Sequence, residues 1–135
     1  MSPQEAQEIQ DIAYRYFLKE SGSEQGAQKL MQGLAALVQE QGAKLVHINN
    51  LLFLVLVRGK GVIEFHTIGE EQSSKEYAND IVQLTKYVKN IGVKLLYTYA
   101  QSRAFDRVAR QTGLPIVKTQ TQINGSPIFV YAVEF

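Results

Sequence analysis

Two residues with complementary chemistry, Glu64 and His66, stand two positions apart in a run of strand-like sequence. Because successive side chains of a β-strand point to opposite faces, residues at i and i+2 share one face. A carboxylate beside an imidazole raises the affinity of the imidazole for a proton, and such a pair can take a proton from a substrate. The spacing therefore predicts a proton-handling pair. A cross-strand polar pair on a partly hydrated sheet face is the structural alternative.

The first histidine of the chain, His47, would extend this pair to three potential metal ligands. Two histidines and one carboxylate can bind iron or zinc on one face of the ion. However, the spacing of His47, Glu64 and His66 matches no recognised ligand motif, and the chain has two histidines and no cysteine. The sequence therefore predicts no metal site.

Arg103, Arg107 and Arg110 recur at helical spacing, and Lys118 follows them. Such a row can bind phosphate, nucleic acid or an acidic partner, but Asp106 lies among the arginines, which is typical of a solvated helix face. The whole chain has 14 basic and 13 acidic residues, a net charge of +1. Proteins that neutralise nucleic-acid phosphates usually have a larger positive excess, so charge does not indicate nucleic-acid binding.

The elements that would position these residues follow from hydrophobic periodicity and turn residues. Helical spacing of apolar residues predicts two amphipathic helices before Gly42, a long helix opened by Ser73 and Ser74, and a short helix capped by Ser102. In the long helix, Ser73 and Glu76 match a capping box. Strand-like runs separated by turn residues predict strands over residues 44–48, 51–58, 62–67, 93–99, 114–123 and 127–135. The last two would form a hairpin, because Asn-Gly between them favours a tight turn.

Together these elements predict one domain over residues 1–135, of the α/β (α+β) class. Its elements would follow the order ααβββ-α-β-α-ββ and include a mixed sheet. Residues 1–42 would form an N-terminal helical pair and residues 43–135 the sheet core. The strand at 62–67 and the strand at 93–99 are expected to be parallel neighbours, joined by a right-handed crossover through the long helix.

Composition indicates a soluble protein inside a cell. Hydrophobic residues make up 45% of the chain, which is ordinary for a globular domain. The longest apolar run covers residues 51–57, whereas a membrane helix needs roughly 20 residues. The lack of cysteine and of a signal-like N-terminus predicts a cytoplasmic location without a membrane anchor.

The order of elements from residue 44 onward resembles that of the GNAT family, which transfers acyl groups from acyl-CoA to amines. The family often has an Asn after its fifth strand, then an Ala, a Tyr and a Gly-Phe pair at set spacing. The matching positions here are Gln101, Ala104, Val108, Gly113 and Leu114. The resemblance implies that acetyl-CoA is the cofactor and that Glu64 or His66 deprotonates the amine. It also implies that the backbone N–H groups near Thr67 and Ile68 polarise the thioester.

Two positions depart from the family's pattern. The family's tyrosine is usually taken to protonate the departing thiolate, and Val108 has no proton to give. The family's pyrophosphate loop is rich in glycine, whereas the segment 69–74 has one glycine and the adjacent acids Glu70 and Glu71. Binding of CoA would then rely on the amides of Ser73 and Ser74, with Gln101 or water in place of the missing acid.

The chain also resembles small GNAT-like proteins of tailed bacteriophages, some of which are minor or internal virion proteins, in the segments 62–67, 96–99 and 131–135. With the missing residues, this favours a non-catalytic protein that acts through contacts with other proteins, in the host cytoplasm or the virion. A divergent acyl-CoA-dependent N-acetyltransferase is the first alternative, and an inhibitor of a host enzyme is the second. The N-terminal helices and the exposed sheet edge would be partner surfaces, and homo-oligomers remain open.

Overall fold

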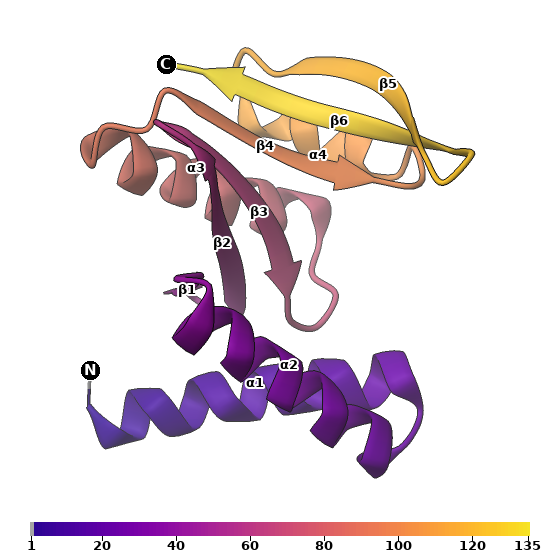
Figure 1. The fold of residues 1–135 in the computed structure, drawn as a ribbon. Helices are drawn as coiled ribbons and strands as arrows, with labels where there is room; N and C mark the ends of the chain where they lie inside the picture. The colour runs from indigo at the N-terminus through magenta and orange to yellow at the C-terminus, as the bar shows by residue number, and fades with distance from the viewer. Residues whose placement is uncertain (1) are drawn as a thin grey trace. The chain divides into compact units, whose positions relative to one another are not determined.

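The computed structural model describes residues 2–135 and has the predicted order of elements (Figure 1). The helices are α1 (Pro3–Ser21), α2 (Glu24–Glu40), α3 (Ser74–Asn90) and α4 (Phe105–Thr112). The strands are β1 (Lys44–Ile48), β2 (Leu51–Gly59), β3 (Val62–Ile68), β4 (Leu95–Ala100), β5 (Val117–Ile123) and β6 (Ser126–Glu134). None of the helices in this part of the chain is long and apolar enough to cross a membrane.

The six strands are ordered β1-β2-β3-β4-β6-β5 in one mixed sheet. β3 and β4 are parallel neighbours, as predicted, and α3 is the crossover between them. The pairs β1–β2, β4–β6 and β5–β6 are antiparallel. The hairpin turn forms at Asn124 and Gly125, which both have positive φ, as the Asn-Gly pair predicts. The α+β class and the mixed sheet are therefore confirmed.

Some element ends differ from the prediction for local reasons. α4 begins at Phe105 with Ala104 as its N-cap, so Ser102 does not cap this helix. The hydroxyl of Ser102 accepts instead from the Ala104 N–H at 3.4 Å, in the preceding turn. β4 begins after Val93, whose N–H still donates to the last turn of α3. The first arm of the hairpin begins at Val117, because residues 114–116 form a tight turn.

The contacts of the chain group it into two compact units, and the single domain over residues 1–135 stays a prediction. The first unit comprises the residues up to Leu56 together with Thr67–Glu71. The second unit comprises Val57–His66 and Gln72–Phe135.

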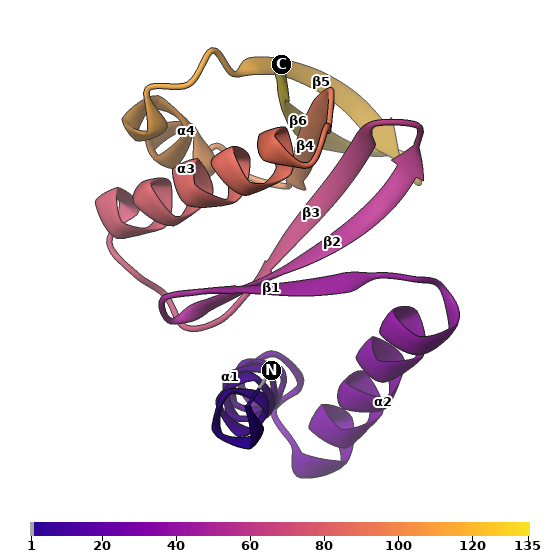
Figure 2. The ribbon, with the colours of Figure 1, turned by 90° about the vertical axis from the view of Figure 1, so that its left-hand side faces the viewer.

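The first unit packs α1 and α2 on β2 (Figure 2). Ser2 and Ser23 cap the two helices, because their hydroxyls accept from backbone N–H groups in each first turn. Gly22 ends α1 with φ of 75°, a left-handed conformation that glycine adopts without steric cost. The buried core residues of this unit come from both helices, from the residue before β1, from β2 and from the end of β3, and they are Ile9, Ile12, Ala13, Leu34, Ala43, Leu52, Leu54 and Ile68.

The second unit has helices on one face of its strands (Figure 1). Burial alternates along β4 and β6, so that Leu96, Thr98, Tyr131 and Val133 are buried while the residues between them are only partly buried. These buried residues line a cavity of about 20 Å³ together with side chains of α3 and α4. The face that carries Tyr97 therefore points away from the helices of its own unit.

The predicted capping box of α3 is present in altered form. The Ser73 hydroxyl accepts from the Glu76 N–H at 3.2 Å, which is the expected half of the motif. The Glu76 carboxylate accepts from that same hydroxyl at 3.1 Å, rather than from the backbone N–H of Ser73. The side chain of Ser73 is thus occupied in starting the helix.

Candidate functional site

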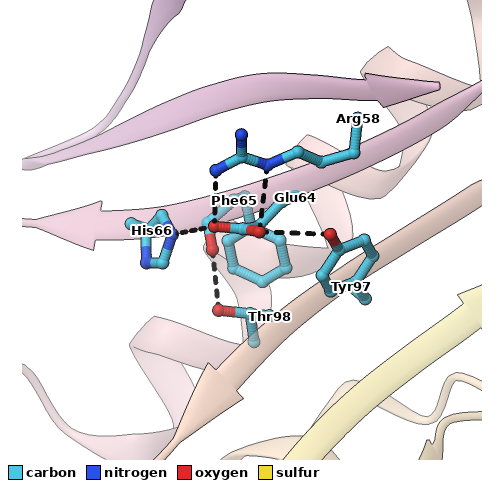
Figure 3. Close-up of polar contacts among 6 residues, drawn as sticks. All are labelled: Arg58, Glu64, Phe65, His66, Tyr97 and Thr98. Atoms are coloured by element: carbon cyan, nitrogen blue, oxygen red, sulfur yellow. Dashed lines mark hydrogen bonds and ion pairs between the residues drawn. The ribbon is translucent and has the colours of Figure 1, made fainter. Parts of the chain in front are cut away.

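A polar cluster lies on the second unit's strands, on the face away from α3 and α4 (Figure 3). Arg58 comes from the end of β2, Glu64 and His66 from β3, and Tyr97 from β4. The parallel register places Glu64 beside Tyr97, so the two side chains share a face. Glu64 and His66 contact each other directly, as their spacing predicts.

The Glu64 carboxylate is the centre of this cluster, and its side chain is only 8% exposed. Oε1 accepts from Arg58 Nε at 3.2 Å and from the Tyr97 hydroxyl at 3.1 Å. Oε2 contacts His66 Nε2 and lies 3.5 Å from Arg58 Nη2. Both oxygens are therefore engaged, as a buried carboxylate requires.

These partners decide the protonation states of the cluster. Burial alone would raise the pKa of Glu64, but the hydrogen bonds from Arg58, His66 and Tyr97 outweigh it and hold the pKa below its ordinary value of 4.5. Burial and the adjacent Glu64 carboxylate raise the pKa of Tyr97 to about 12. At neutral pH Glu64 is consequently an anion, and Tyr97 keeps the proton that it donates.

His66 is the member of the cluster that solvent reaches, since its side chain is 42% exposed. Its Nε2 faces the Glu64 carboxylate, an arrangement that favours a proton on this nitrogen. The other ring nitrogen, Nδ1, then carries the lone pair and can accept a proton. In this geometry His66 has the features of a base, and Glu64 orients its ring.

The pairing of β3 with β4 ends at this cluster. The register runs from Val62 to Glu64, although β3 continues to Ile68 and β4 continues beyond Tyr97. Just beyond that point, the Thr98 hydroxyl donates to the carbonyl of Phe65 at 2.7 Å (Figure 3). A side chain thus satisfies a carbonyl at the place where the backbone ladder stops.

Two residues of the cluster, Arg58 and Tyr97, could not be assigned from the sequence. Tyr97 and Tyr99 share a strand face because they are two positions apart, and their rings meet edge to face at 5.5 Å. No sequence pattern indicates a functional role for Arg58, because it follows an apolar run and precedes a turn. Its role depends on which strand lies next to β3.

The other predicted site residues do not contact the Glu64 carboxylate through any hydrogen bond described above. His47 is half-buried on β1, in the first unit. No three histidines or carboxylates in residues 2–135 are grouped to hold a metal ion. Ile68 is buried in the core of the first unit, and Thr67, beside it, is half-buried. Gln101 is exposed in the turn after β4.

The segment before α3 has its own structural roles. Gly69 has φ of 155°, and a Cβ there would lie 2.6 Å from Leu51 Cδ2, so this glycine permits close packing. Glu70 lies 3.9 Å from Arg15 in an exposed ion pair. Next to the N-terminus of α3, Gln72 Oε1 is buried and has no hydrogen-bond partner in the described residues. Ser74 is the first residue of the helix.

Arg107 and Arg110 lie on α4, whereas Arg103 lies in the turn before this helix, so the three arginines do not share one helix as their spacing predicts. Arg103, Arg107 and Arg110 are exposed. Asp106 accepts from the Tyr131 hydroxyl at 2.5 Å and from Lys118 Nζ, which links α4 to the terminal hairpin. These hydrogen bonds hold the pKa of Asp106 below its ordinary range.

The position that the family resemblance assigns to the acid is Val108, on α4. Its side chain is buried, 7% exposed, in the packing of this helix. The side chain therefore contributes to the core of the second unit and cannot supply a proton.

No protein-family model matches this sequence, and no curated protein matches it. Solved structures do. A mutant of the spermidine N-acetyltransferase from Vibrio cholerae superposes with a TM-score of 0.61 at 12% identity, covering 83% of this chain and 76% of that one. The IAA acetyltransferase from Bacillus cereus gives 0.54 at 14% identity, covering 92% and 93%.

A GNAT-family acetyltransferase from Elizabethkingia anophelis, solved with acetyl-CoA bound, gives a TM-score of 0.55 at 12% identity, covering 92% and 91%. At such low identity these similarities show the fold alone. The chain has the fold of the GNAT acetyltransferases, as the order of elements predicted. The resemblance to bacteriophage proteins has no support among these structures.

Proposed function

We propose that this protein is a divergent N-acyltransferase that uses acetyl-CoA, with His66 as the general base. The observation that carries the proposal is the Glu64–His66 pair at the point where β3 and β4 stop pairing. A buried anion orients an imidazole that solvent reaches, and this is an arrangement suited to taking a proton from an incoming amine. Structural similarity to acetyltransferases supports the reaction class.

Each residue of the cluster has a defined role in this proposal. His66 Nδ1 takes the proton from the amine nitrogen as that nitrogen attacks, which leaves a positive imidazolium next to the Glu64 anion. Glu64 stabilises this charge without itself being protonated, because its pKa is held low. Arg58 and Tyr97 keep the carboxylate in place.

Acetyl-CoA would supply the activated acyl group as a thioester. As the N–C bond forms, the C–S bond would break and CoA would leave as a thiolate, which would take its proton from water, while the Gln101 amide would donate a hydrogen bond to it. A thiolate is a tolerable leaving group, so the lack of an acid at Val108 does not prevent the reaction. In this proposal the backbone N–H groups near Thr67 and Ile68 polarise the carbonyl of the thioester.

The N-terminus of α3 is the place where CoA would bind. Gln72 Oε1 is buried just before it and has no hydrogen-bond partner among residues 2–135; such an acceptor would receive a hydrogen bond from an amide or hydroxyl group of CoA, not from its pyrophosphate. The first N–H groups of a helix have no intrahelical acceptor and suit a pyrophosphate. Ser73 and Ser74 would donate their backbone N–H groups there, since the Ser73 side chain is used in capping.

A second candidate is a non-catalytic protein that acts through protein contacts. Two observations favour it: Val108 is buried where the family has its acid, and Glu70 and Glu71 bring negative charge near the proposed pyrophosphate site. A bacteriophage origin, a place in the virion and inhibition of a host enzyme are finer versions of this candidate, suggested by sequence resemblance alone.

Calorimetric titration of the purified protein with acetyl-CoA and with free CoA separates the two candidates. We expect binding in the micromolar range for the enzyme. Ser74→Pro is the sharpest variant, because proline is tolerated at the first helical position and removes the N–H that would reach the phosphate, together with the Ser74 hydroxyl. Loss of one hydrogen bond to a charged group should weaken binding about 10- to 100-fold.

The matched control is Glu24→Pro, which makes the same change at the first position of α2. It should leave CoA binding unaltered. If neither ligand binds at millimolar concentration, the acyltransferase proposal is wrong and the non-catalytic candidate replaces it. If CoA binds, a screen of primary amines as acceptors with His66→Gln as the inactive reference tests the chemistry.

A further inference from the structure

The outermost strand on one side of the sheet, β5, has an open edge. Every residue of this strand is exposed. Its pairing with β6 is continuous from Val117 to Ile123, without a bulge. In residues 2–135 no strand pairs with its outer side, so a row of backbone N–H and C=O groups faces outward.

This edge lacks the features that usually protect an edge strand, which are charges, prolines, bulges or very short length. Residues 119–123 read Thr-Gln-Thr-Gln-Ile, with no charge and no proline. The one charged residue, Lys118, is turned back to its own unit. Its Nζ lies 2.9 Å from Asp106 and 4.4 Å from the ring centre of Phe129. Nothing in the strand therefore discourages pairing with another strand.

The two ends of β5 carry exposed aliphatic side chains. Val117 is 63% exposed and Ile123 is 41% exposed, and both belong to the large hydrophobic residues left at the surface. They lie on the same face of the strand, because they are separated by an even number of positions. A monomer leaves both side chains in water.

We propose that β5 pairs antiparallel with β5 of a second copy of this chain, around a twofold axis at Gln120. The sequence of the strand is nearly symmetric about this residue: Thr-Gln-Thr in the centre, a polar residue on each side and an aliphatic residue at each end. The twofold axis then matches apolar with apolar and polar with polar. The opposed pairs are Val117 with Ile123, Lys118 with Gln122, Thr119 with Thr121, and Gln120 with its own copy.

A second copy fits this strand better than an unrelated strand for a specific reason. A twofold interface is self-complementary, so each residue must accept the residue that the symmetry places opposite it. In this register no like charges meet, and the two exposed aliphatic residues cover each other. An unrelated partner would require no such symmetry in the sequence. The inference is independent of the acyltransferase proposal.

Two variants that differ only in position test the register. Gln120→Glu places two carboxylates opposite each other at the axis and should weaken the dimer about two- to fivefold. Gln122→Glu places a carboxylate opposite Lys118 of the second copy, twice by symmetry, and should tighten the dimer about two- to tenfold at low salt, because Lys118 can then pair with this carboxylate as well as with its own Asp106. Both changes keep the side-chain size and lie on the same exposed face.

Sedimentation equilibrium of the wild type and both variants measures these dissociation constants. We expect a dimer of the 15.2 kDa chain and opposite shifts for the two variants. A monomer at all concentrations overturns the proposal, and so does a dimer whose dissociation constant ignores both changes or moves in one direction for both. Thermal melting checks that these surface variants fold as the wild type does.

A thiol gives a second readout, because the chain has no cysteine. Gln120 is the one position of β5 that the axis places opposite itself, so Gln120→Cys should form a disulfide between copies under mild oxidation. Gln122→Cys is the control, since its two copies would be too far apart to bond. Equal crosslinking of both variants would rule out the proposed register.

Discussion

Two carboxylates of the second unit, Glu64 and Asp106, have similar partners and different surroundings. Each accepts a hydrogen bond from a tyrosine hydroxyl, Tyr97 for Glu64 and Tyr131 for Asp106. Each also pairs with a cation, and each has its pKa held below the ordinary range. The two clusters lie on opposite faces of the strands. Tyr131 pairs with Thr98, which is next to Tyr97 on β4, so Tyr131 shares the buried face with Thr98 while Tyr97 points to the other face.

The difference lies in the third partner. Glu64 is buried and contacts the exposed imidazole of His66. Asp106 is partly exposed, and its cation, Lys118, lies over the ring of Phe129. A carboxylate with a tyrosine and a lysine therefore joins α4 to the hairpin, while the imidazole beside Glu64 makes the other cluster a candidate for proton transfer.

The largest expected effect is a loss of catalytic rate on mutation of the Glu64 cluster, which mutation of the Asp106 cluster should not cause. If the protein is an acyltransferase, His66→Gln should lower its rate about 10²- to 10⁴-fold, because it removes the base. Its melting temperature should stay near that of the wild type, because the side chain is 42% exposed. Steady-state assays with acetyl-CoA measure the rate.

The comparison variant for activity is Asp106→Asn, which disturbs the other cluster. It should lower stability and leave the rate per folded molecule unchanged. A variant of Asp106 that loses activity as His66→Gln does would contradict the assignment of the two clusters.

The next largest effect is on stability, and it compares the loss of the hydroxyl of Tyr131 with the loss of the hydroxyl of Tyr97. Tyr131→Phe should lower the free energy of unfolding by about 1.5–3 kcal/mol, the range for a hydrogen bond to a charged group. Tyr97→Phe should cost about 0.5–1.5 kcal/mol, because Glu64 keeps Arg58 and His66. Chemical denaturation of both variants measures the difference, and a larger loss for Tyr97→Phe would reverse our ranking.

A smaller effect concerns acid pH. The folded pKa of Glu64 lies below 4.5, so its contribution is complete above that pH and is lost as pH falls through the folded pKa. Glu64→Gln should therefore be less stable at neutral pH and should lose less further stability on acidification. Unfolding free energies measured from pH 7 downward test this. Parallel curves for wild type and variant would show that folding does not lower the pKa of Glu64.

The smallest expected effect is on the titration of Tyr97 at alkaline pH. The pKa of Tyr97 is raised from 10.0 to about 12, so its contribution is present below pH 10 and is lost as pH rises through about 12. In Glu64→Gln this pKa should move back toward 10, because the neighbouring negative charge is gone. Phenolate absorbance during a pH titration reports it, with Tyr97→Phe to assign the signal. An unchanged titration curve in Glu64→Gln would contradict the contact.

The order of elements and much of their local detail could be predicted from the sequence. Periodicity, capping residues and turn residues act over a few positions, so the helix start at Ser73 and the turn at Asn124–Gly125 were readable locally. The contact between Glu64 and His66 was predictable for the same reason, because strand geometry alone puts them on one face. The cap predicted at Ser102 is wrong, because a turn intervenes between this residue and α4.

The sequence by itself thus determined the types and order of the elements and the pairing of neighbours within one strand. Only the tertiary structure decided which partners surround Glu64. Tyr97 is 33 positions away, and Arg58 reaches the carboxylate from a different strand. Such contacts depend on strand order and register, which arise from the packing of the whole sheet and leave no local pattern in the sequence.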